Sequence, residues 1–361
     1  MNLKKVLYIL SILFSFALKA QEEVKKDSTK NLDITLFPVA FYTPETDFGF
    51  GALGIASFWL HGEKRSTRSS SVQLGVSYTT KNQFLLYFPF EIYSDNEKWR
   101  VIGELGYYKY VYNYYGQGIT SLEEDSENYE VTFPRLRMSV LREVLPDFSV
   151  GLGYQLDNFT NLKEEEDGLL ANSTVIGKDG GMVSNVGLLA FYDTRDDIFY
   201  PTKGFFIQGN FFTSSNFLGS SFKYSKFNLD SRYYKKVGKR KIIATNLFFG
   251  SSSSGTPFLD QFYIGGKRTR GFSSRRFQDN AEASLALEYR FHISGRFGAA
   301  VFGSTSTVAP NFKDLFSSPL KNSGGAGLRY IINKRDGVRL RADYGYSKEG
   351  GNISFTILEA F

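Results

Sequence analysis

Two glycine-rich stretches are the first candidates for chemistry in this sequence. Residues 49–54 read Gly-Phe-Gly-Ala-Leu-Gly, a pattern that binds dinucleotide phosphates when a strand precedes it and a helix follows. Here strand-like sequence continues through Trp59, so we interpret these glycines as easing packing and curvature within a strand. Residues 250–255 read Gly-Ser-Ser-Ser-Ser-Gly and lack the Gly-x-Ser-x-Gly spacing of a hydrolase nucleophile.

Metal and thiol chemistry have little support. The chain has no cysteine, which excludes disulfides, thiol catalysis and a lipoprotein anchor, and its two histidines, His61 and His292, lie far apart. The acidic runs at 123–125 and 164–167 lack the alternating ligand spacing of a Ca²⁺ loop, which favours solvated surface loops. We therefore expect no enzyme activity, no metal and no cofactor.

The composition indicates the class of fold that positions these residues. The chain has 361 residues, of which 42% are hydrophobic, yet its mean hydropathy is −0.25, so apolar and polar residues must be interleaved. The content of 35 Phe, 23 Tyr and 35 Gly is typical of membrane barrels with aromatic girdles and tight bends. A soluble β-sandwich is the alternative, but this chain is long for one sandwich and rich in aromatics for a water-facing surface.

The N-terminus resembles an export signal. In residues 1–20, Lys4 and Lys5 precede an apolar stretch, 6–18, that is shorter than the roughly 20 residues of a membrane-spanning helix. Loss of this signal peptide removes three lysines and leaves 40 basic against 37 acidic residues, a formal charge of +3. That balance argues against nucleic acid as a partner. Residues 21–33 are then expected to form a short periplasmic tail.

Period-two alternation indicates the fold class. In 72–79 and 338–346, apolar residues alternate with polar or small ones, and in 285–292 the second set includes Glu288, Arg290 and His292. Charges on one strand face are costly in hydrocarbon but suit a wet barrel interior. Within 84–93, Pro89 predicts a bulge or kink. These patterns predict an all-β, transmembrane antiparallel β-barrel over residues 34–361 in a bacterial outer membrane.

The alternating segments number about 16, the even count that bacterial single-chain barrels require. A periplasmic N-terminus would make the acidic loops 113–126 and 161–179 and the segment 251–280 extracellular. Short connections such as 61–64 and 333–337 would be periplasmic turns. The strands are expected near 34–42, 46–60, 67–80, 82–93, 97–112, 127–142, 147–160, 180–194, 203–215, 219–237, 240–250, 281–294, 296–307, 321–333, 337–347 and 351–361.

One patch around residues 192–204 resembles the BamA/TamA superfamily of outer-membrane barrels, also called the bacterial surface antigen family. The residues are Asp193, Arg195 and Asp196, followed by Pro201 and Gly204. They are similar to the family's periplasmic turn between its eighth and ninth strands, which is where the periodicity also places them. The resemblance extends over about residues 34–361.

A second patch, Arg270-Gly271-Phe272, resembles the family's Arg-Gly-aromatic motif in the extracellular loop after strand 11. The resemblance implies that this loop folds into the lumen and that Glu288 is the acidic partner of Arg270, which would pin the loop. Ser304 stands where the family usually has an Asp, so the resemblance implies that the arginine has lost one acidic partner.

The C-terminal strands also resemble the family, and Phe361 fits the terminal aromatic residue that barrel-assembly machinery reads. Alternation in 352–361 places Glu359 on the same face as Phe361, close to the periplasmic rim, with Phe361 as the end of the last strand.

The resemblance implies a POTRA-less member that contributes to outer-membrane protein assembly, insertion or translocation. The implied partners are outer-membrane lipids, other assembly subunits or client barrels. Because assembly members receive clients through POTRA domains, two alternatives stay open. One is a plugged pore or small-solute transporter, and the other is a structural or partner-docking barrel of a larger outer-membrane complex.

Overall fold

The computed structural model describes residues 32–43, 46–60, 67–124, 126–332 and 339–361. The expected signal peptide, the tail up to residue 31 and the expected turns at 61–64 and 333–337 lie outside the described residues.

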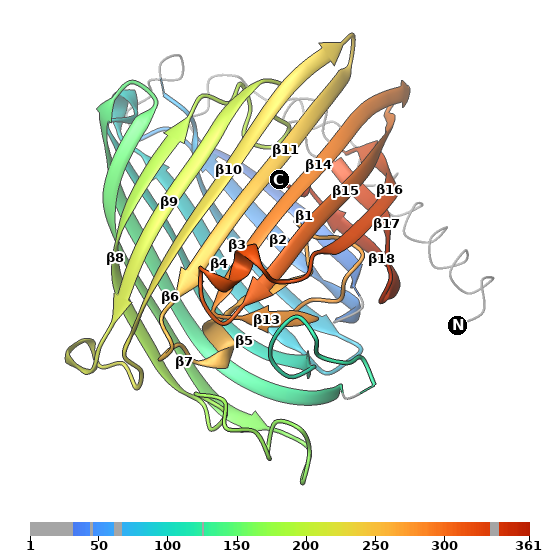
Figure 1. Cartoon of the computed structure of the whole chain (residues 1–361). Coiled ribbons are helices and arrows are strands. Elements are labelled where there is room, and N and C mark those ends of the chain that lie inside the picture. The colour runs from blue at the N-terminus through green and yellow to red at the C-terminus, as the bar shows by residue number, and fades with distance from the viewer. Residues whose placement is uncertain (1–31, 44–45, 61–66, 125, 333–338) are drawn as a thin grey trace.

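Sixteen strands of the described chain form one closed antiparallel barrel, as the alternation predicted (Figure 1). Each strand pairs with its sequence neighbours, except that β11 pairs with β14, and β1 closes the ring against β18. The barrel strands are β1 (Leu32–Thr43), β2 (Asp47–Phe58), β3 (Ser70–Thr79), β4 (Phe84–Tyr93), β5 (Trp99–Tyr114), β6 (Glu127–Leu145), β7 (Phe148–Lys163), β8 (Gly181–Asp193), β9 (Gly204–Ser214), β10 (Tyr224–Gly238), β11 (Lys241–Ser252), β14 (Ala281–Ser294), β15 (Phe297–Ala309), β16 (Lys321–Ile331), β17 (Arg339–Ser347) and β18 (Gly350–Ile357).

The segment between β11 and β14 carries the remaining elements. Strands β12 (Phe262–Ile264) and β13 (Phe277–Asp279) pair with each other as a separate two-stranded sheet. Short 3₁₀ helices punctuate the connections of the described chain, namely η1 (Asp95–Glu97), η2 (Asn216–Leu218), η3 (Phe258–Asp260) and η4 (Asp314–Phe316). None of the helices in the described residues is long and apolar enough to cross a membrane.

The two faces of the strands have the predicted chemistry. On β3, Leu74 is 55% exposed on the outer face, whereas Ser77 is 6% exposed on the inner face. On β14, Leu287 points outward, and Glu288 and Arg290 are fully buried. Apolar side chains thus face the lipid and charged ones face the interior, where they can pair with each other.

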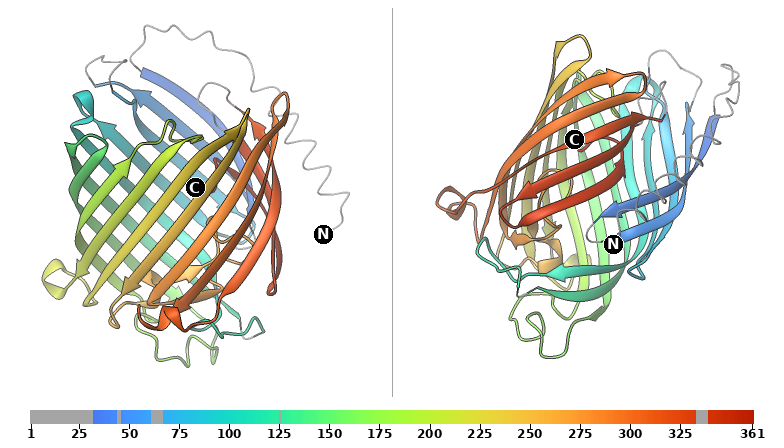
Figure 2. Two further views of the ribbon diagram at one scale, coloured as in Figure 1. Left: turned by 45° about the horizontal axis from the view of Figure 1, so that its top comes forward. Right: turned by 90° about the vertical axis from the view of Figure 1, so that its right-hand side faces the viewer.

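The barrel has two different ends (Figure 2). We call them the long-loop end, which carries the connections 115–126, 164–180, 215–223, 253–280 and 310–320, and the short-turn end, which carries 146–147, 194–203, 239–240 and 295–296. The described chain also begins and ends at the short-turn end, because the number of strands is even.

The expected bulge at Pro89 is not present. Val72 is registered with Phe90 and Gly75 with Tyr87, so β3 and β4 keep one register across the proline. Proline lacks an N–H group and interrupts the ladder hydrogen bonds, but here no extra residue is inserted and the strand stays in step.

Candidate functional site

Arg270, in the segment between β11 and β14, is held on the inner side of the barrel wall by the carboxylates of Glu288 and Asp343. Its side chain is 5% exposed, its Nη1 donates to Asp343 at 2.8 Å, and its Nη2 donates to Glu288. The Arg270 guanidinium also lies 3.5 Å from the ring centroid of Phe302 on β15. A planar guanidinium can donate one hydrogen bond to each carboxylate while its face lies on the ring, and these three contacts together fix its orientation.

This arrangement differs from the expectation of a single acidic partner. The hydroxyl of Ser304, the residue for which the resemblance implied a family Asp, pairs with that of Ser323 at 2.8 Å. The second carboxylate comes instead from Asp343 on β17, on the inward face that the alternation predicts. The arginine therefore keeps two acidic contacts from two different strands.

Next to the arginine, two glycines bring two backbones together. A Cβ atom added at Gly345 on β17 would lie 2.5 Å from the backbone nitrogen of Gly271. Gly271 has a φ of +105°, and the hydroxyl of Ser347 donates to its carbonyl oxygen at 2.9 Å. Only glycine at both positions allows so close an approach.

Phe272 anchors the same segment through apolar contacts. It is 3% exposed and packs with Ile119, Ile264, Phe277 and Val308, so the cluster joins β13, β15 and the 115–126 connection. The structure thus brings Arg270, Gly271 and Phe272 against strands β14, β15 and β17.

The Arg270 contacts belong to a larger buried charge network. Arg290 donates from Nε to Glu288 at 2.6 Å, and Arg329 donates to Asp343 at 2.5 Å and to Glu359 at 2.9 Å. All of these side chains are at most 3% exposed. Each charge has an opposite neighbour, which offsets the large cost of burying it.

The C-terminal residues contradict two expectations. Strand β18 ends at Ile357, Leu358 takes a φ of +70°, and the chain then turns into the barrel. Glu359 pairs with Arg329 rather than facing lipid, and Phe361 is 6% exposed beside Tyr234. A carboxylate next to two buried arginines is far more stable there than at the lipid-facing rim.

The turn patch at 192–204 forms a tightly hydrogen-bonded connection at the short-turn end. Arg195 binds both carboxylate oxygens of Asp193 at 2.8 Å, and Asp193 also meets Arg68 from the β2–β3 connection at 3.2 Å. Gly204 has a φ of +107°, and a Cβ there would lie 2.3 Å from the carbonyl oxygen of Thr194. Pro201 is buried within the same turn.

Asp196 organises the far side of this turn. Its carboxylate accepts hydrogen bonds from the backbone amides of Thr202 at 2.8 Å and Lys203 at 3.1 Å, and from the Thr202 hydroxyl at 2.5 Å. Partial burial disfavours the charged form, but these donors outweigh it and lower the pKa of Asp196 below its ordinary value.

The closure between β1 and β18, which we call the seam, is short. One residue pair is registered across it, Tyr42 with Phe355, whereas β1 and β2 are registered from Leu32–Phe58 through to Thr43–Asp47. Because β18 ends at Ile357, the stretch 32–39 of β1 runs beyond it and has no registered partner strand on that side within the described chain.

The two glycine-rich motifs lie in and beside barrel strands. The glycines at 49–54 lie within β2, as interpreted from the sequence, and the 250–255 stretch spans the end of β11. Among the residues that the structure describes, no three His, Cys, Asp or Glu side chains are grouped to hold a metal ion. His292 lines a cavity at the short-turn end.

Sixteen antiparallel strands with an apolar outer face and a charged interior define an integral outer-membrane β-barrel. Residues 60–361 match the model of the Omp85 superfamily domain, and the chain belongs to that superfamily. Its barrels are assembly and transport proteins rather than enzymes, and they work with the membrane and with client proteins.

Three solved structures have the same fold at low sequence identity. A BamA from Haemophilus ducreyi lacking POTRA domains 1–3 matches at 15% identity and a TM-score of 0.58, over 91% of this chain and 70% of that one. CdiB from Acinetobacter baumannii matches at 11% and 0.56, over 91% and 60%. CdiB from Escherichia coli matches at 11% and 0.62, over 92% and 63%. The chain thus spans about two thirds of their lengths, and none of the curated proteins matches it.

Proposed function

We propose that this barrel inserts other β-barrel proteins into the outer membrane by opening at the seam between β1 and β18. The single registered pair, Tyr42 with Phe355, is the observation that carries the proposal. Strand pairing holds a barrel closed, so the least paired closure is the one that opens at the lowest cost.

The part of β1 that extends past β18 supports the same proposal. Residues 32–39 extend past β18, and Leu32, Ile34 and Leu36 on this stretch are 51–78% exposed. A strand edge with an apolar lipid-facing side and no registered neighbour among the described strands is a template on which another strand can add. A client strand would supply the backbone hydrogen bonds that the seam lacks.

In this proposal the short-turn end faces the periplasm and the long-loop end faces outward. We further propose that the segment 253–280 narrows the lumen, held in place by the ion pairs of Arg270 with Glu288 and Asp343. A lumen narrowed in this way would favour a route for clients along the wall over a route through the centre, and it would disfavour a resting small-solute pore. Other outer-membrane assembly subunits are the proposed partners that deliver clients to the edge.

A disulfide across the seam tests the proposal, because the natural chain has no cysteine. Tyr42→Cys with Phe355→Cys places two cysteines in direct register, at the spacing a disulfide requires. The matched control is Ala342→Cys with Phe355→Cys, which keeps one cysteine and bridges the ordinary β17–β18 ladder instead.

The assay measures folding of an unfolded client barrel added to vesicles that contain each variant. We expect the seam disulfide to remove the acceleration, a reductant to restore it, and the β17–β18 disulfide to leave it unchanged. Equal activity of the oxidised seam variant and the wild type would refute opening at the seam. A wild-type barrel no faster than empty vesicles would refute insertion itself.

A further inference from the structure

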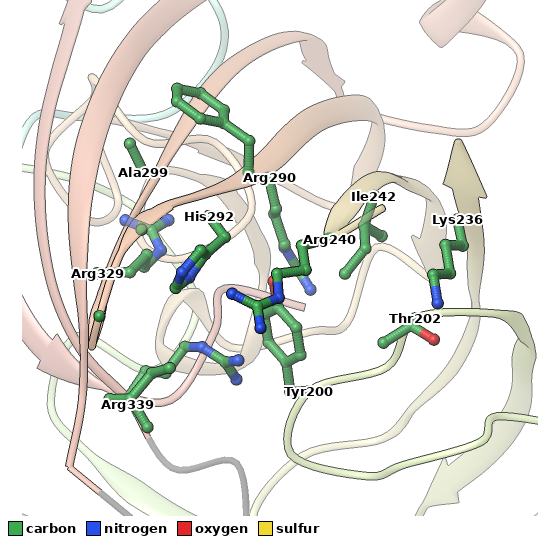
Figure 3. A pocket seen from close by; sticks show the side chains of 14 residues that line it. Tyr200, Thr202, Lys236, Arg240, Ile242, Arg290, His292, Ala299, Arg329 and Arg339 are labelled. Carbon is green, nitrogen blue, oxygen red and sulfur yellow. The ribbon is translucent and has the colours of Figure 1, made fainter. Parts of the chain in front are cut away.

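A cavity of about 460 Å³ lies at the short-turn end of the lumen, away from the seam and bordered on one side by Arg290 and Arg329 of the charge network (Figure 3). Its walls come from the 194–203 turn, the β10–β11 hairpin and strands β14, β15, β16 and β17. Figure 3 shows the side chains of Arg240, Arg290 and Arg339 directed toward Tyr200. The volume is that of a small-molecule pocket rather than of a single bound water.

The lining of this cavity is strongly basic. Among the described residues that line it there is no carboxylate, and five are cationic, namely Lys236, Arg240, Arg290, Arg329 and Arg339. Glu288 and Glu359 neutralise Arg290 and Arg329 as members of the charge network. Asp197, on the turn that carries Tyr200, accepts backbone hydrogen bonds from Phe199 and Tyr200 at 2.7 Å. Arg339 is attracted by Glu359 and Asp197. Lys236 and Arg240 form no ion pair with a carboxylate among the described residues, so these two side chains leave the chamber with excess positive charge.

One buried donor in the wall lacks an acceptor. Arg290 is 1% exposed, and it uses Nε for Glu288 and Nη2 for the backbone oxygen of Phe361 at 2.7 Å. Its Nη1 has no hydrogen-bond partner within the described part of the chain. A buried cationic donor without an acceptor is costly, so an oxygen-rich anion in the chamber would be stabilised by it.

We propose that this chamber binds a phosphate group. Guanidinium groups match the oxygens of phosphate in pairs, and a lysine at the rim adds a point charge. The compact shape favours a phosphate on a small molecule or lipid head group over an extended acidic peptide, which would need a groove. This inference does not depend on opening at the seam.

Two double variants separate a local site from bulk charge. Lys236→Gln with Arg240→Gln removes two cationic side chains that line the chamber. Lys235→Gln with Lys239→Gln removes the same charge from the neighbouring positions of the same strand and turn, neither of which lines it. All four residues are exposed, so both variants should fold.

The first measurement is calorimetric titration of the intact barrel with inorganic phosphate, in neutral detergent at low ionic strength. The second is native mass spectrometry after release from micelles that contain phosphatidate and phosphatidylcholine. We expect the wild type and the Lys235/Lys239 variant to behave alike, and the Lys236/Arg240 variant to bind about tenfold more weakly.

The two measurements also distinguish the source of the phosphate. A loss confined to phosphatidate retention would identify a lipid head group, and a loss of inorganic phosphate binding would identify a soluble ligand. Equal binding by both variants, or no binding of either probe by the wild type, would overturn the proposal. Binding of a polyglutamate peptide at this rim, without either phosphate probe, would overturn it as well.

Discussion

Nη1 of Arg270 donates a 2.8 Å hydrogen bond to Asp343, a residue 73 positions further along the chain. This bond ties the segment between β11 and β14 to β17, across the interior of the barrel. The same guanidinium binds Glu288 on β14, so three separate parts of the sequence meet at one side chain.

Arg270→Ala is expected to release the segment and open a conducting path. The substitution leaves Asp343 and Glu288 buried with one cationic partner fewer, which costs about 3 kcal/mol of stability. Planar-bilayer recordings should show little current from the wild type and clear current from the variant, and urea titration in vesicles should show the lower stability.

The conservative variant Arg270→Lys provides the control. Lysine keeps the charge but cannot bind two carboxylates with a planar fork while lying on Phe302, so we expect an intermediate result. Identical currents from the wild type and both variants would show that this side chain does not close the lumen.

Gly345→Ala tests the close backbone approach without changing any charge. The added Cβ would lie 2.5 Å from the backbone nitrogen of Gly271, so the loop must move away from β17. Trypsin should then cleave faster after Arg268, Arg270 and Arg275. Gly209→Ala on β9 is the matched control, because its Cβ would meet nothing within 4 Å. Equal cleavage of the two variants would contradict the steric argument.

Phe361→Ala separates two roles of the last residue. As an internal anchor, Phe361 packs beside Tyr234, Ala244 and Ala286, and its loss should destabilise the barrel by about 3 kcal/mol. The variant should still reach the outer membrane and unfold at lower urea. If it instead fails to assemble in cells but matches the wild type when refolded in vesicles, the residue acts as an assembly signal and contributes little to stability.

The turn at 194–203 should loosen in acid. The pKa of Asp196 is lowered in the folded protein, so its contribution is present above the unfolded pKa and is lost as the pH falls through the folded value. Protection of the Thr202 and Lys203 amides against hydrogen exchange should drop roughly fivefold there, about 1 kcal/mol after allowance for solvent screening.

The matched variant Asp196→Asn should show that lower protection at neutral pH and no further loss in acid. An acid response of equal size in the wild type and in Asp196→Asn would assign the response to another group.

Most of the barrel could be predicted because lipid and lumen impose period-two alternation on every strand. Each expected strand overlaps an observed one, and the inward positions of Glu288 and Arg290 follow from the same rule. Pro89 shows its limit, since a missing N–H group signals an interrupted ladder but does not reveal whether a residue is inserted.

The site was less predictable, because pairing between distant strands leaves no local signal. Alternation places Asp343 inward, but nothing in the sequence says that it faces Arg270 rather than Arg329 alone. The turn at Leu358 was missed for a related reason. In the sequence the apolar alternation of β18 continues to Phe361, and only the pairing with the buried arginines explains why Glu359 leaves it.

Glu288 gives the charge network a further property. One of its oxygens binds Arg270 of the loop and the other binds Arg290, which in turn holds Phe361. The 253–280 segment and the C-terminal residues beyond β18 thus share Glu288, so we expect that drawing the segment away changes the free energy with which the C-terminus is held. By thermodynamic reciprocity, displacing the C-terminus must change the affinity of the segment by the same factor. One carboxylate thus connects the 253–280 segment to the C-terminal residues.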